Sequence, residues 1–327
     1  MITRRRLLAA SATAALAPGL MARAQTREEG WPSRHVRLIV PFPPGGGTDA
    51  VGRILSTRLA EMWGQQIIIE NRGGAGSNVG SEAGARAAPD GYTMLFAAFP
   101  FATNRFIYRT IPYDPIVDFT PITLIGTFPN IMVVPNTSPA KSVAEFIAYA
   151  KANRGDITFG SSGIGTSPHL NGELFMRMAG FEMTHIPYRG AGPAITDLIP
   201  GRLTMMFNTS GSLMPHVQSG RLRALAVSSG KRFSAVPELP TVAESGVPGF
   251  DVSSWYGLLV PSKTPPAIVR KMNADAVSAM REPEIRKRLE GLGLEVVAST
   301  PEEFGAFIKA EMTKWEPIIK AANILAQ

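Results

Sequence analysis

The sequence predicts a mixed α/β protein of two lobes, each a mostly parallel sheet flanked by helices. Short apolar runs rich in Val and Ile alternate with helical patterns along nearly the whole chain, which is typical of parallel sheets covered on both faces. A strand, a glycine-rich turn and a helix start occur at 36–60 and again at 157–179. Two long apolar segments punctuated by proline, 122–135 and 250–261, have the character of crossings between lobes. We therefore expect two similar sheets joined by crossing strands.

The individual elements follow from two periodicities. Short Val- and Ile-rich runs predict strands at 36–42, 66–70, 93–98, 122–126, 131–135, 157–161, 183–187, 203–208, 222–228, 254–260 and 294–298. Apolar residues at helical spacing predict helices at 49–63, 78–87, 142–152, 167–179, 191–199, 212–219, 265–280, 283–291 and 301–321. The crossings divide the chain into a discontinuous first lobe, about 25–126 and 255–327, and a continuous second lobe, about 127–254.

Residues 1–24 predict an export signal rather than part of the fold. Three arginines at 4–6 precede an apolar run at 7–20, and a small-residue Ala-Arg-Ala cleavage pattern ends at residue 24. The segment Thr-Arg-Arg-Arg-Leu-Leu at 3–8 is similar to a twin-arginine signal. The apolar run is short for a membrane span, and an uncleaved anchor is the alternative interpretation. We expect an exported protein.

Composition excludes several kinds of site. The whole chain carries a net charge of +7, but residues 1–24 hold four arginines and no acids, which leaves +3 for the mature chain. No stripe of Lys and Arg with interleaved aromatics follows, so we expect no nucleic-acid partner. The chain has no cysteine, which excludes disulfides and thiolate chemistry. The four histidines lack metal-ligand spacing and there is no EF-hand pattern, so we expect no metal and no cofactor.

The first glycine-rich turn predicts an anion-binding loop. Gly45, Gly46 and Gly47 allow a ligand to approach the main chain closely. Thr48 and Asp49 are suitable capping residues for the helix that follows, whose free N–H groups and dipole favour a carboxylate or phosphate. A nucleotide-binding Walker loop would need Gly-Lys-Ser/Thr at this point, and the chain has Thr48-Asp49 instead. A capped turn without a ligand is the alternative.

A second turn, at 71–80, contains Gly74 and Gly76 but has Val79 where a dinucleotide fingerprint needs its third glycine. The next strand does not end in a clear ribose-binding acid. We therefore predict a turn that packs beside the opening loop rather than an NAD site.

The turn at 160–170, "GSSGIGTSPHL", predicts the opposing half of a binding cleft. Ser161, Ser162 and Thr166 supply hydroxyls at a helix start, and His169 lies inside that helix as a packing or ligand-lining residue. The segment lacks Gly-x-Ser-x-Gly, and neither an orienting acid nor an oxyanion hole is identifiable. An exported hydrolase that uses Ser161 or Ser162 with His169 stays as an alternative. Among the tryptophans, we place Trp255 near the cleft.

An ordered series of motifs resembles one family over essentially the whole mature chain. These are "WPSRHVRLIVPFPPGGGTDAVGRIL", "IIIENRGGAGSNVGSEAGARAAPDGYTMLFA", "HIPYRGAGPAITDLIPGRLTMMFN" and "SSWYGLLVPSKTPP". They resemble the exported solute receptors of tripartite tricarboxylate transporters, the Bug family. The resemblance implies a two-lobed periplasmic binding protein of type II, a monomer without enzymatic activity. It would capture a small carboxylate by hinge closure and deliver it to a membrane permease. A sensor that docks on a membrane signalling protein is the alternative.

The resemblance also implies the ligand-binding residues. In the first lobe they are Phe42, Pro43, Gly45, Gly46, Gly47, Thr48 and Asp49, and in the second Ser161, Ser162, Gly165, Thr166 and His169. Neutral donors of this kind suffice for a carboxylate, so no lysine or arginine is needed in the pocket.

Four positions in the chain depart from the family pattern, and one of them is Pro168, where relatives often have a small residue. Ala98 and Phe99 stand where relatives usually have small polar residues, which predicts a more apolar third wall. Asn208 replaces an aspartate that many relatives have, which favours a ligand without an ammonium group.

Overall fold

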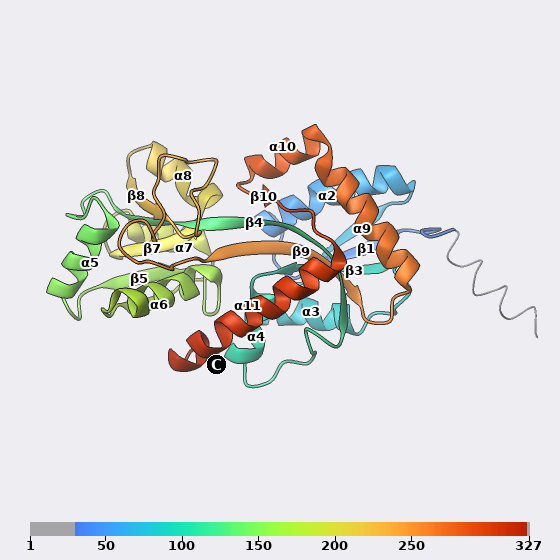
Figure 1. Ribbon diagram of the computed structural model, residues 1–327, viewed down its shortest axis with the longest axis horizontal. Helices are drawn as coiled ribbons and strands as arrows, with labels where there is room; N and C mark the ends of the chain where they lie inside the picture. Colours follow the sequence, from blue (N-terminus) through green and yellow to red (C-terminus); the bar gives the residue numbers. More distant parts are fainter. Residues whose placement is uncertain (1–29, 326–327) are drawn as a thin grey trace, which may run out of the picture.

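The computed structural model describes residues 30–325, and its strands form one ten-stranded arrangement in the order β2-β1-β3-β9-β4-β7-β5-β6, with β8 and β10 paired to β4 (Figure 1). The predicted export signal at 1–24 lies outside the described residues. The strands are β1 Val36–Val40, β2 Ile67–Asn71, β3 Thr93–Ala98, β4 Phe119–Pro135, β5 Thr158–Ser161, β6 Thr184–Pro187, β7 Met205–Thr209, β8 Leu222–Val227, β9 Ser253–Pro261 and β10 Glu295–Val296. The α/β prediction is confirmed.

Helices connect most of these strands. They are α2 Gly47–Trp63, α3 Asn78–Ala85, α4 Pro100–Ile107, α5 Val143–Ala152, α6 Ser167–Ala179, α7 Ala191–Leu198, α8 Ser210–Gln218, α9 Pro266–Arg281, α10 Pro283–Gly291 and α11 Pro301–Ala321, with a short 3₁₀ turn, η1, at Ala75–Ser77. Elements from α5 to α8 gather at one end of the molecule and β1, α2 and α9 at the other, with β4 and β9 running between them (Figure 1). No helix among residues 30–325 is long and apolar enough to cross a membrane.

Parallel pairing occurs in two groups of strands. β1 pairs in parallel with β2 and β3, and β5 pairs in parallel with β6 and β7. Every pairing made by β4 or β9 is antiparallel. The two parallel groups are therefore joined by β4 and β9, because β9 pairs with β3, β4 pairs with β7, and β4 and β9 pair with each other.

β4 is a single strand of 17 residues where the sequence predicted two separate strands. Its first part, up to Pro129, pairs with β9, and from Asn130 onward it pairs with β7. Pro129 faces Ser253, where β9 begins, and Asn130 faces Thr209, where β7 ends. The proline lacks an N–H for a ladder bond, but it stands where one neighbour gives way to the next, so the strand continues through it. The predicted lobe limits stay a prediction.

The helix α4 was missed at the sequence level. It has only eight residues, and its polar Thr103 and Asn104 are buried together with Phe101 and Ile107, while Arg105 is exposed. Burial therefore does not follow hydrophobicity along the segment, and eight residues offer few turns in which a helical period can be detected. The available signal was Pro100 at the first helical position, where proline is favoured.

The core is continuous through the crossing strands. One cluster of buried side chains includes Leu95, Trp255 and Phe207, which come from both parallel groups and from β9. The predicted apolar face of α11 joins this cluster, with Phe304 and Trp315 fully buried. The walls of any site between the groups therefore rest on one packed interior.

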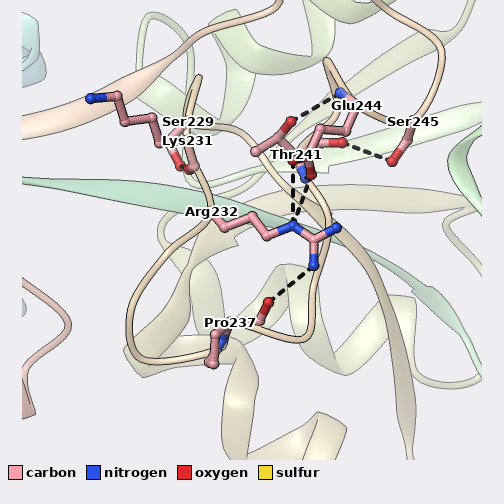
Figure 2. A network of polar contacts seen from close by, with 7 residues as sticks. All are labelled: Ser229, Lys231, Arg232, Pro237, Thr241, Glu244 and Ser245. Carbon is pink, nitrogen blue, oxygen red and sulfur yellow. Dashed lines mark hydrogen bonds and ion pairs between the residues drawn. The ribbon is translucent and has the colours of Figure 1, made fainter.

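Side-chain bonds brace the long irregular segment between β8 and β9 (Figure 2). Arg232 donates from Nε to the Glu244 carboxylate at 3.0 Å and from Nη1 to the Pro237 carbonyl at 3.2 Å. Glu244 and Thr241 also exchange bonds, because each backbone N–H reaches the other side chain. The segment is thereby closed on itself, which restricts its freedom beside β8.

Candidate functional site

A cavity of about 740 Å³ lies where the two parallel groups of strands face each other. Its walls contain the predicted residues Phe42, Pro43, Gly45, Gly46, Gly47, Thr48, Ala98, Phe99, Ser162, Thr166 and Asn208. They also contain Pro44, Pro100, Phe128, Ser167, Pro168, Arg189, Ala191, Gly192, Thr209, Ser212, Ser254, Trp255 and Tyr256. Four predicted residues, Asp49, Ser161, Gly165 and His169, are not among the lining residues and instead support the loops that line the cavity.

The opening loop brings the start of α2 to the cavity. Gly45 has a φ of +86°, a left-handed conformation that glycine adopts without strain, and Gly46 is the residue before the helix. The helix begins at Gly47, so Thr48 and Asp49 lie inside its first turn, and the prediction that they cap it is wrong. A Cβ on Gly47 would lie 3.1 Å from the Tyr256 hydroxyl, which shows how closely β9 approaches this helix start.

Asp49 braces the opening loop from behind. Its carboxylate accepts from the Gly45 N–H at 3.1 Å, from Asn71 at 3.1 Å and from Arg53 through two bonds of 2.8 and 3.0 Å. The bond to Arg53, followed by those to Gly45 and Asn71, lowers the pKa of Asp49 to about 2 against the opposing effect of burial. The predicted turn at 71–80 packs here, as Asn71 also donates to the Phe42 carbonyl.

Removing the Asp49 carboxylate should loosen this loop. We expect Asp49→Ala to lower the free energy of unfolding by about 1–2 kcal/mol, the modest value reflecting screening by water around the exposed Arg53. The wild-type contribution is complete above the unfolded pKa of 3.8 and is lost as the pH falls through about 2. Urea unfolding at neutral pH and at about pH 3 measures both effects, with the exposed Asp156→Ala as the control. Unchanged stability with weaker ligand binding in both Asp49→Ala and Asp49→Asn would instead assign Asp49 to the ligand.

The second loop brings the start of α6 to the opposite wall. Asn208 donates to Ser162 Oγ at 3.1 Å, and Thr166 Oγ1 donates to the Gly163 carbonyl at 2.7 Å. Ser167, the first residue of α6, is bonded to Asn130 of β4 at 3.2 Å and to Ser254 of β9. The helix start is therefore attached to both crossing strands.

The geometry contradicts the Ser–His hydrolase alternative. Ser161 is fully buried, and its Oγ lies 2.7 Å from Nε2 of His185, not from His169. His169 accepts from the Gly165 N–H through Nδ1 and faces Glu173 through Nε2. Neither serine therefore has His169 as a base, and Ser161 has no access to a substrate.

Sequence reasoning missed Arg189 and Tyr256 as cavity residues. Arg189 follows β6, whose end lies beside that of β5 because Pro187 pairs with Ser161, and carboxyl ends of parallel strands meet at one edge. It is the charged residue of the cavity wall, so the wall holds a cation although the sequence predicted that no lysine or arginine is needed there. Burial raises the pKa of Tyr256, which therefore offers a neutral hydroxyl. Within residues 30–325, no cluster of three or more His, Asp or Glu is suited to a metal.

Comparison with known proteins identifies this arrangement. The model of the tripartite tricarboxylate transporter family receptor matches residues 51–324. The chain belongs to this receptor family. The resemblance seen in its motifs is confirmed, and the protein is a binding receptor, not an enzyme.

Relatives of this receptor share its length and its fold. It is 34% identical to protein BugT of Bordetella pertussis over 292 residues, which cover 89% of this chain and 90% of the relative. The solved structure of Rpa4515 of R. palustris with adipate has a TM-score of 0.83 at 36% identity, covering 90% of this chain and 98% of the other. MatC of Rhodopseudomonas palustris with bound malate gives 0.78 at 31%, covering 88% and 100%. The receptor therefore has the mixed α/β periplasmic binding protein fold.

Proposed function

We propose that the receptor captures a small organic carboxylate in the cavity between its two parallel groups of strands, closes around it and delivers it to a tripartite permease. The observation that carries this proposal is the charge of the cavity wall. Arg189 is its charged residue, and no Asp or Glu lies among the lining residues. A cavity with a cation and no carboxylate favours an anion over an amine or a neutral solute.

The donors of both walls suit a carboxylate. The starts of α2 and α6 meet at the cavity, and free N–H groups at helix starts favour anions. Hydroxyls of Thr48, Ser162 and Tyr256 add neutral donors. Between these walls lie Phe99, Phe128 and other apolar groups, which suit a short hydrocarbon backbone. Related receptors hold adipate and malate, each with two acid groups.

Capture would take place in the periplasm after removal of residues 1–24. Closure would remove the ligand from water and strengthen its bonds to the loop donors. The receptor, as a monomer, would deliver the ligand to the integral-membrane part of the transporter. This part of the proposal rests on the family alone.

Isothermal titration of the mature protein with acetate, malate, adipate and citrate tests the ligand class. We expect at least one di- or tricarboxylate to bind with a Kd of about 1 μM or tighter, and acetate to bind far more weakly. Trp255, the tryptophan of the cavity wall, gives a second readout through its fluorescence. The Trp255→Phe variant should lose that signal, which assigns it to the tryptophan of the cavity wall. A folded protein that binds none of the four would contradict the proposed ligand class.

A further inference from the structure

Two histidines stack beneath the second ligand loop. His169 of α6 and His185 of β6 lie with ring centroids 3.7 Å apart at an interplanar angle of 14°. The ring of Phe159 of β5 stacks with both imidazoles, with centroid distances of 4.8 Å to His185 and 6.1 Å to His169. His169 is 4% exposed. Buried polar rings of this kind are held by specific bonds, because an unpaired polar atom there is costly.

Each imidazole binds a different part of the loop at 161–166. His185 Nε2 lies 2.7 Å from Ser161 Oγ, which also accepts from the Gly163 N–H at 3.1 Å. His169 Nδ1 accepts from the Gly165 N–H at 3.1 Å. The loop needs such support, because Gly163 and Gly165 both have left-handed backbone angles, with φ of +133° and +76°.

These bonds lead directly to the cavity wall. The Gly163 carbonyl accepts from Thr166 Oγ1, and Thr166 and Ser162 line the cavity. The two histidines do not line it. The two histidines would therefore affect the ligand through the loop at 161–166 and not by direct contact.

The bond to Gly165 also sets the proton of His169. Because Nδ1 accepts, the proton of the neutral ring is on Nε2, which faces Glu173 Oε1 at 3.4 Å. A second proton on Nδ1 would point at the Gly165 N–H and break that bond. Glu173 from α6 and His185 from β6 are the titratable groups that face His169, while β5 presents Phe159 and α4 places Ile107 against Gly165.

We propose that His169 and His185 are positioning residues that, as neutral imidazoles, hold the loop at 161–166 in its ligand-binding conformation, and that protonation of His169 weakens binding. The effect of these histidines on ligand binding rests on the proposed function. Burial and the neighbouring His169 lower the pKa of His185 to about 3, so His185 stays neutral. Ligand affinity then falls with protonation of the His169 ring, although no lining residue changes its charge.

The ligand-free mature protein tests the positioning itself. Long-range ¹H–¹⁵N spectra of the imidazoles should show His169 protonated on Nε2 at about pH 7.5. Acidification should shift the Gly165 amide with the same midpoint as the His169 ring. A proton on Nδ1 of neutral His169, or a Gly165 amide indifferent to its titration, would overturn the proposal. This outcome does not depend on which ligand binds.

Adipate titrations of variants test the effect on binding. Asparagine can place its amide oxygen near Nδ1 and does not titrate, whereas leucine keeps the bulk without an acceptor. We expect His169→Leu to bind adipate about tenfold more weakly and His169→Asn within about threefold of wild type. On acidification the wild type should lose more affinity than His169→Asn, in which only the protonation of adipate itself weakens binding. The exposed His35→Asn is the matched control and should follow the wild type.

Two results would refute this role: wild-type affinity in His169→Leu, or equal losses in the Leu and Asn variants, which would indicate packing alone. If wild-type protein binds neither adipate nor the other acids, the proposed ligand class fails. The imidazole and Gly165 spectra then still decide the positioning role.

Discussion

Replacing Arg189 with glutamate is expected to reduce carboxylate affinity at least about 100-fold. The change removes a charged donor, worth about 1.5–3 kcal/mol in a hydrogen bond to an anion, and places a carboxylate in a wall that has none. Isothermal titration with whichever acid of the panel binds best measures the loss. Because the side chain is exposed and forms no ion pair with another described residue, the fold should keep its stability.

A matched control separates local from general electrostatics in this experiment. Arg154→Glu makes the same change in net charge at another exposed site of the second parallel group, away from the cavity, and should leave the affinity within about twofold. Arg189→Lys keeps the charge without the planar fork and should fall between wild type and the glutamate variant. Equal affinities for Arg189→Glu and Arg154→Glu would remove Arg189 from the site.

The largest loss of stability is expected from Gly257→Val. Gly257 lies in β9 between Ala97 of β3 and Leu124 of β4, and a Cβ there would overlap the ring of Phe304. Phe304 is fully buried and packs edge-on against Trp255. A close-packed core cannot absorb this volume, so the free energy of unfolding should fall by about 3 kcal/mol or more.

Urea unfolding of the mature protein measures this effect. Gly291→Ala is the control, because nothing lies within 4 Å of a Cβ at the end of α10, and it should change stability by no more than about 0.5 kcal/mol. Combining Gly257→Ala with Phe304→Leu should recover part of the loss that Gly257→Ala causes alone. A wild-type unfolding midpoint for Gly257→Val would mean that Phe304 does not pack as described.

The sequence was most informative where local chemistry determines the structure. The glycines at 45–47 and the hydroxyls at 161–166 identified both loops, because left-handed turns and helix starts have short-range signals. Arg189 had no such signal. Its place in the wall depends on the pairing of β6 with β5, which joins segments 26 residues apart in register, as Thr158 with Thr184.

The same distinction explains the other differences. The role of Asp49 depends on Asn71, 22 positions away, and the partner of Ser161 is His185, 24 positions away. Neither contact follows from spacing along one element. α4 escaped detection because it is short and its burial does not follow hydrophobicity, and the continuity of β4 because a proline normally ends a strand.

β4 pairs with β9 in its first part and with β7 in its second, and this has a consequence for the proposed closure. In the proposed closure, rotation of one group against the other would be absorbed where it breaks few ladder bonds. Pro129 and Asn130 are the candidate position, because pairing passes there from β9 to β7 and the proline has no N–H to lose. Asn130 also holds Ser167 at the start of α6. Bending of β4 at this position would therefore reorient the start of α6, and with it the donors that this helix presents to the cavity.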